Sequence, residues 1–213
     1  MKLYSAYYSG GYPFDQLPFE ETITTSDPRD LTEKGALVIW GGADISPSIY
    51  GKRVSKRTHA GQQLSKRDIV EVDLAKQAIA IGMPIIGVCR GAQLLCGLAG
   101  GHLIQHVNNH GGTHTVVTND GQEFVTNSIH HQMMYPFDVK HEIRAFMRNA
   151  LSDVYVDVDD NGKDIHVQVP VEPEYVYFPT VKGYAVQWHP EGMSIYSEAN
   201  QYLLSDLRKE LFQ

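Results

Sequence analysis

A cysteine stands between an apolar segment and a segment with helical character, with one glycine two residues before it and another two residues after it. Residues 84–88 predict a buried parallel strand, and residues 90–99 predict a helix that a Gly-Gly pair stops. The flanking glycines let neighbouring backbone approach the turn closely. The pattern therefore predicts a sheet at whose end Cys89 is exposed on a tight, strained turn.

Other segments alternate in the order expected of a three-layer α/β sandwich. Residues 36–40 are an apolar run that feeds two glycines, and apolar spacing predicts a helix over 66–81. Residues 184–188 predict a final core strand, and a helix is expected over 194–211. Short alternating segments within 102–190 predict antiparallel strands added to a mostly parallel central sheet.

A thiolate nucleophile needs a base, and the base needs a group that orients it. His189, Pro190 and Glu191 follow the last core strand directly, so His189 is expected at the same edge of the sheet as Cys89. His-Pro-Glu alone is a weak signal, because many surface turns contain it. Together with the turn, it predicts Cys89 as nucleophile, His189 as base and Glu191 as orienting acid. The alternative for Cys89, a buried structural thiol, is disfavoured by the flanking glycines.

Acyl transfer also requires donors for the developing oxyanion. The backbone N–H of Arg90, directly after the nucleophile, is one candidate. A second is the N–H of Gly42, in the Gly41–Gly42 pair that follows the strand at 36–40. A plain tight turn is the alternative interpretation of that glycine pair.

Six motifs occur in collinear order: 41–51, 67–71, 87–93, 100–106, 127–132 and 187–191. With these motifs the chain resembles class I glutamine amidotransferase domains and, more narrowly, the gamma-glutamyl-gamma-aminobutyrate hydrolase family of cysteine peptidases. The resemblance implies a flavodoxin-like three-layer fold and a Cys-His-Glu triad.

The same resemblance implies that a γ-glutamyl group lies near Gly41 and Gln93, with His130 and Gln132 as further substrate contacts. Arg67, Asp68 and Glu71 also match family positions, and we expect them to form an ion-pair cluster on the surface of a helix.

Three functions remain open. The first is a free-standing cysteine hydrolase that converts a γ-glutamyl amine to glutamate and amine through a γ-glutamyl thioester. The second is a glutaminase subunit that passes ammonia to a separate synthetase or ligase chain. The third is a binding or regulatory protein on the same fold, which the complete set of catalytic residue types disfavours.

Composition narrows the partners and the compartment. The net charge of −7 disfavours nucleic acid and anionic membranes. We expect the basic cluster at 52–67 to be solvated, with most of its residues in a loop over 43–65. We expect one domain over 1–213, and a small γ-glutamyl compound as ligand. Either a homodimer or a trans-acting synthetase partner is compatible with this. Two thiols without a secretory leader predict a cytoplasmic protein.

No cofactor is predicted. The histidines at 102, 106, 110 and 114 are evenly spaced, and on a helix they would form one metal-binding face. Glycine pairs interrupt this segment, however, and its second half predicts a strand. Because no cysteine or carboxylate lies nearby in the sequence, we expect no metal site.

Overall fold

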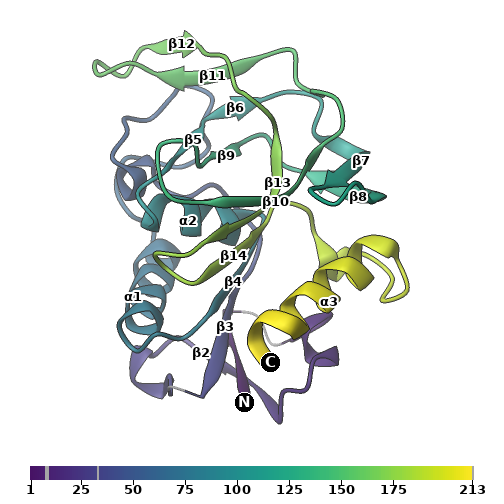
Figure 1. Cartoon of the computed structure of the whole chain (residues 1–213). Coiled ribbons are helices and arrows are strands. Elements are labelled where there is room, and N and C mark those ends of the chain that lie inside the picture. The colour runs from purple at the N-terminus through teal and green to yellow at the C-terminus, as the bar shows by residue number, and fades with distance from the viewer. Residues whose placement is uncertain (8–9, 33, 213) are drawn as a thin grey trace.

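The computed structural model of the chain describes residues 1–7, 10–32 and 34–212. Within these residues nine strands form one sheet, in the order β2-β1-β3-β4-β14-β13-β10-β7-β8 (Figure 1). The first five in this order run parallel: β2 (Glu21–Thr25), β1 (Lys2–Ala6), β3 (Gly35–Ile39), β4 (Ile85–Val88) and β14 (Gly183–Val186). The other four are antiparallel: β13 (Pro173–Phe178), β10 (Glu142–Met147), β7 (Gly111–Thr118) and β8 (Glu123–Ile129). The expected parallel sheet with added antiparallel strands is confirmed.

Helices cover both faces of the parallel strands. Figure 1 shows α1 (Lys66–Ala80) and α2 (Arg90–Leu98) on one side of the sheet and α3 (Glu198–Phe212) on the other. A hydrophobic core lies on each face of the sheet, and alternate side chains of β3 pack into the two cores. Leu37 packs on the side of α1 and α2, and Val38 packs on the side of α3. Both faces of the strand are therefore buried, which is why its sequence is apolar throughout.

The helix boundaries follow local signals. Ser65 and Asp68 form a capping box that starts α1, as their side chains bond to each other's backbone N–H groups. The helix expected from residue 194 begins only at Glu198, because the 3₁₀ turn η4 (Pro190–Gly192) and a turn closed by the Ser197 N–H on the Ser194 carbonyl come first. The expected loop over 43–65 also contains the 3₁₀ turn η3 (Pro47–Tyr50).

Two small sheets lie beyond one end of the large sheet (Figure 1). One contains β12 (Asp164–His166), β11 (Tyr155–Val158) and β6 (His106–Val107); the other pairs β5 (His102–Ile104) with β9 (Met133–Tyr135). Short 3₁₀ turns η1 (Phe14–Gln16) and η2 (Pro28–Asp30) complete the N-terminal part. In the described residues, no helix has the length and apolar character needed to cross a bilayer.

Candidate active site

The turn after β4 holds Cys89 in a strained conformation with a positive φ of 48° and a ψ of −101°. The backbone packs so closely there that a Cβ on Gly91 would lie 2.0 Å from the carbonyl oxygen of Ile39. A Cβ on Gly87 would lie 2.5 Å from the backbone of Gly91. The predicted strained turn is therefore present, and the two glycines are required by close backbone contact with β3 and α2.

His189 reaches the same edge of the sheet because β14 runs parallel to β4, with Val186 in register with Val88. Its Nδ1 donates to Glu191 Oε1 at 2.7 Å. Hydrogen bonds to Cys89 and then to Glu191 outweigh burial and raise the pKa of His189 to about 10. The ring is therefore a cation at neutral pH, and its charge stabilises negative charge on the neighbouring sulfur.

Asn127 fixes the backbone of the histidine. Its side-chain amide donates to the His189 carbonyl at 2.8 Å and accepts from the His189 N–H at 2.9 Å. Sequence reasoning included Asn127 in a motif but assigned it no role. A side chain 62 residues from its partner gives no local signal of this contact.

The Gly41–Gly42 loop lies against both groups. A Cβ on Gly41 would lie 2.6 Å from His189 Cε1 and 3.5 Å from Cys89 Cβ, so no larger residue fits. Arg67 Nη2 donates to the Gly41 carbonyl at 3.0 Å. Because the C=O and N–H of a trans peptide point in opposite directions, the Gly42 N–H points away from Arg67. This orientation suits the role of oxyanion donor that the sequence suggests for Gly42.

The expected surface ion-pair cluster on α1 is wrong. Asp68 and Glu71 are buried and pair with the buried Arg90, whose Nη2 lies 2.5 Å from Asp68 Oδ1 and whose Nη1 also contacts Glu71. Arg67 Nε donates to Glu71 Oε1 at 2.8 Å. The spacing of these charges along α1 is that of an ordinary exposed ion pair. Their buried partner, Arg90, lies 19 residues from Glu71 and 22 residues from Asp68 in the sequence. Arg90 thus joins α1 to the first turn of α2, directly behind the nucleophile.

A pocket of about 180 Å³ opens beside Cys89. Among the residues lining it are Gly42 and three residues expected to contact substrate: Gln93, His130 and Gln132. The side chains of Gln93 and His130 both bond to the Gln132 carbonyl, at 3.1 and 2.9 Å. These three residues form a hydrogen-bonded wall. A larger hollow of about 570 Å³ lies between β8 and α3, but Cys89 does not line it.

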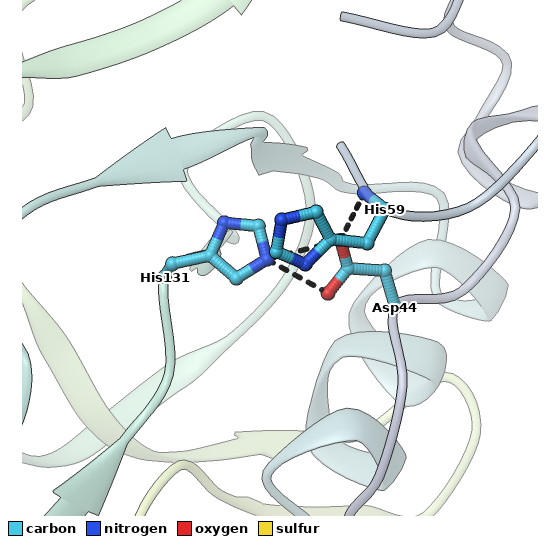
Figure 2. Close-up of side chains that lie close together, drawn as sticks. All are labelled: Asp44, His59 and His131. Carbon is cyan, nitrogen blue, oxygen red and sulfur yellow. Dashed lines mark hydrogen bonds and ion pairs between the residues drawn. The ribbon is translucent and has the colours of Figure 1, made fainter. Parts of the chain in front are cut away.

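Figure 2 shows Asp44, His59 and His131 together at this pocket. Both carboxylate oxygens of Asp44 lie 3.0 Å from His131 Nε2, and the His59 N–H donates to Asp44 at 2.8 Å. Burial opposes ionisation of Asp44, but these bonds outweigh it and hold its pKa below the usual value. The cluster ties the loop after β3 to the segment after β8. Sequence reasoning missed His59, which stands in a loop without any periodic pattern.

Two groups among the described residues have ligand atoms close enough to share a metal ion: Asp44, His59 and His131, and His110, His130 and Glu174. One of the reasons for expecting no metal was that no carboxylate lies nearby in the sequence. That reason does not hold in the fold, because β13 brings Glu174 within 3.2 Å of His114 and 3.8 Å of His130.

The sheet order and the turn at Cys89 define a protein with the glutamine amidotransferase fold. The family model for Peptidase C26 matches residues 10–134, and the chain belongs to this family. The resemblance found in the sequence is thereby confirmed, and the family is one of hydrolases.

The chain is similar in sequence to two relatives and similar in structure to one solved protein. The glutamine amidotransferase-like protein YvdE of Lactococcus lactis is 28% identical over 196 residues, which cover 82% of this chain and 72% of the relative. The gamma-glutamyl-CDP-amidate hydrolase of Campylobacter jejuni is 30% identical over 117 residues, 55% of this chain and about half (52%) of the relative. The glutaminase domain of Trypanosoma brucei CTPS with bound acivicin has a TM-score of 0.55 at 14% identity, covering 99% of this chain and 94% of that one. The last comparison shows a shared fold.

Replacing Arg90 by methionine should destabilise the protein strongly. The substitution leaves the buried carboxylate of Asp68 without a cation and leaves Glu71 with Arg67 alone, and breaking a buried pair costs about 3–5 kcal/mol. Arg148→Met is the matched control, because that half-exposed pair with Glu123 contributes at most about 1 kcal/mol. Denaturant unfolding followed by circular dichroism gives both values. Equal losses in the two variants would contradict the assignment of Arg90.

The two cysteines should differ in alkylation at neutral pH. Iodoacetamide should modify Cys89, which lines the pocket beside the His189 cation. Cys96 is fully buried, and burial raises the pKa of its thiol to about 12. Mass spectrometry of Cys89→Ala and Cys96→Ala, matched single-thiol variants, measures each rate. Faster labelling of Cys96 than of Cys89 in the folded protein would contradict the assignment of Cys89 as the reactive thiol.

Proposed function

We propose that the chain hydrolyses a γ-glutamyl amide through a thioester on Cys89, with His189 as acid and base and Glu191 as the residue that orients it. The observation that carries the proposal is the contact of one histidine, His189, with both Cys89 and Glu191 at the carboxyl ends of β4 and β14. The 213 residues would act as one hydrolase domain. The Campylobacter relative, by its name, acts on a γ-glutamyl compound, which supports this substrate class.

The chemistry follows from the placement of the groups. The sulfur attacks the γ-amide carbon, a C–S bond forms, and the oxyanion accepts hydrogen bonds from the backbone N–H groups of Arg90 and Gly42. The C–N bond then breaks and the amine takes a proton from His189. A water molecule gives a proton back to His189 as its oxygen attacks the thioester. Glutamate leaves, and the sulfur returns as the anion beside the histidine cation.

The pocket supports a compact acyl group. Its volume of about 180 Å³ suits a glutamyl group, and the wall of Gln93, His130 and Gln132 offers polar atoms at fixed positions. The Asp44–His131 pair at the same pocket provides a carboxylate, which suits the α-ammonium group of a glutamyl substrate.

A second candidate function is a glutaminase that supplies ammonia to a separate synthetase chain. The likeness in fold to the CTPS glutaminase domain favours it. The two functions differ in what the isolated chain does. A free-standing hydrolase has its site assembled without help, whereas a partner-dependent glutaminase gains by remaining idle until its synthetase binds.

The purified chain alone should release glutamate from at least one γ-glutamyl amine, with glutamine as a poorer substrate. The assay measures glutamate at matched substrate concentrations, with Cys89→Ala as the inactive control and Cys96→Ala as the active one. Inactivity on every compound, followed by glutamine hydrolysis when an ATP-dependent ligase partner is added, would favour the glutaminase. Full activity in Cys89→Ala would exclude the proposed mechanism.

Glu191→Gln should lower kcat/KM by at least about tenfold, yet leave more activity than His189→Ala. The substitution removes one of the two bonds that raise the pKa of His189, so that pKa falls from about 10 toward its ordinary value while the Cys89 contact remains. The histidine cation is then lost at lower pH, and the alkaline limb of the pH–rate profile should move down. An unchanged alkaline limb would remove Glu191 from this role.

A further inference from the structure

A cluster of buried histidines and glutamates lies behind one wall of the pocket beside Cys89. His110 precedes β7, His114 is within β7, His130 follows β8, and Glu174 is on β13. Their side chains are at most 3% exposed. They gather where β10 leaves space, because β10 pairs with β7 only through residues 145–147 and the His110 end of β7 lies beyond that pairing.

These groups lack the hydrogen bonds that buried polar atoms normally make. Both ring nitrogens of His110 and of His114, together with His130 Nε2 and Glu174 Oε2, make no hydrogen bond of good geometry among the described residues, although His114 Nε2 lies 3.2 Å from Glu174 Oε1. Such atoms are rare in protein interiors, and several in one place call for a ligand. Each points to the same kind of ligand, because imidazole nitrogen and carboxylate oxygen are both electron-pair donors toward metal ions.

The neighbouring Glu172 differs. Its two oxygens accept from the Leu151 and Ser152 N–H groups at 2.9 Å and from the Tyr155 hydroxyl at 2.7 Å. Local contacts account for this carboxylate fully, and it lies 3.6 Å from His110 Nε2. Glu174, whose Oε2 makes no hydrogen bond, is therefore the carboxylate with an oxygen available to an ion, and Glu172 is placed to orient His110.

His130 has the tautomer of a metal ligand. Its Nδ1 lies 2.9 Å from the Gln132 carbonyl, which only accepts, so Nδ1 carries the proton. In the neutral ring Nε2 then has a lone pair, 3.8 Å from Glu174 Oε1. Two electron-pair donors facing each other in a dry site repel unless a cation stands between them. Donation of the second N–H to a backbone carbonyl is also how histidine ligands of metals are usually oriented.

The distances between the candidate ligand atoms are also compatible with a bound metal ion. One ligand atom from each of His110, His130 and Glu174 lies within 4.8 Å of the others. Two donors on a tetrahedral zinc ion at about 2.0 Å are separated by about 3.3 Å, so small side-chain movements close the site. A hollow of about 320 Å³ is lined by His110 and His130, among others, and gives an ion and water a route from the surface.

The Asp44 cluster is a weaker candidate. Figure 2 shows its histidines close to Asp44, whose carboxylate already accepts hydrogen bonds from His131 and from the His59 backbone. His59 is exposed. Within the described residues, His131 Nδ1 is the one buried atom of this cluster that lacks a hydrogen-bond partner.

We propose that His110, His130 and Glu174 bind one divalent transition-metal ion of the zinc type, with His114 and Glu172 positioning the ligands. The ion would hold the end of β7, the segment after β8 and the start of β13 together. His130 also lines the pocket beside Cys89, so the ion would fix one wall of that pocket from behind. Three protein ligands leave the remaining coordination positions to water.

Metal analysis of the purified full chain tests this directly. The chain is stripped with chelator, reloaded with Zn²⁺ or Co²⁺, desalted and analysed by plasma mass spectrometry, with Co²⁺ absorption as a report on ligand geometry. We expect one ion per chain, a tetrahedral Co²⁺ spectrum and a higher Tm in the loaded protein. His110→Gln and Glu174→Gln should each lower the bound metal at least tenfold and abolish the rise in Tm.

Two controls make the result specific to this cluster. His141→Gln changes a histidine whose ring already bonds to the Val139 carbonyl, and His59→Gln changes the other cluster; both should retain the metal. The wild-type titration does not depend on any variant folding, and His110→Gln lies outside the strands. Failure of the wild-type chain to retain Zn²⁺ or Co²⁺, full retention in His110→Gln and Glu174→Gln, or loss in His59→Gln would each overturn the assignment. None of these readouts depends on hydrolase activity.

Discussion

The contact of Gly91 with the carbonyl oxygen of Ile39 is the constraint on which the arrangement of the site depends. It brings the start of α2 directly onto β3, and this fixes the strained turn at Cys89, which joins β4 to α2. A side chain at position 91 would separate the two elements and release the strained turn that holds Cys89, only 5% exposed, at the edge of the pocket. Because β14 pairs with β4 on its other side, the same contact also sets where His189 stands relative to Cys89.

Buried ion pairs also hold the elements of the site in position. Arg90 extends from the first turn of α2 into a pair of buried carboxylates on α1, and Arg67 extends from α1 to the carbonyls of the loop after β3. Desolvating these ions is costly, and pairing only offsets that cost. We infer that the network is retained for position: it joins the nucleophile turn and the Gly41–Gly42 loop through one helix.

The sequence predicted contacts between residues that are close together in the chain, and it missed contacts between residues that are far apart. The turn at Cys89 and the His189–Glu191 contact involve residues within a few positions of one another, so glycine spacing and strand ends were enough to predict them. Asp68 was misplaced on a surface because its partner Arg90 lies 22 residues away. Glu174 was missed as a neighbour of His114 because only the pairing of the antiparallel strands brings them together. Local patterns report neighbours in sequence, whereas burial depends on the whole sheet.

The segment after β8 is where these constraints meet. Asn127 holds the backbone of His189, His130 faces Glu174, and His131 pairs with Asp44 across the pocket. A segment with so many distant partners is costly to order, because each fixed residue loses conformational entropy. A metal ion behind His130 would reduce that cost by linking the segment to β7 and β13 before substrate arrives. The walls of the pocket would then be pre-organised, and less of the substrate's binding free energy would be used in arranging them.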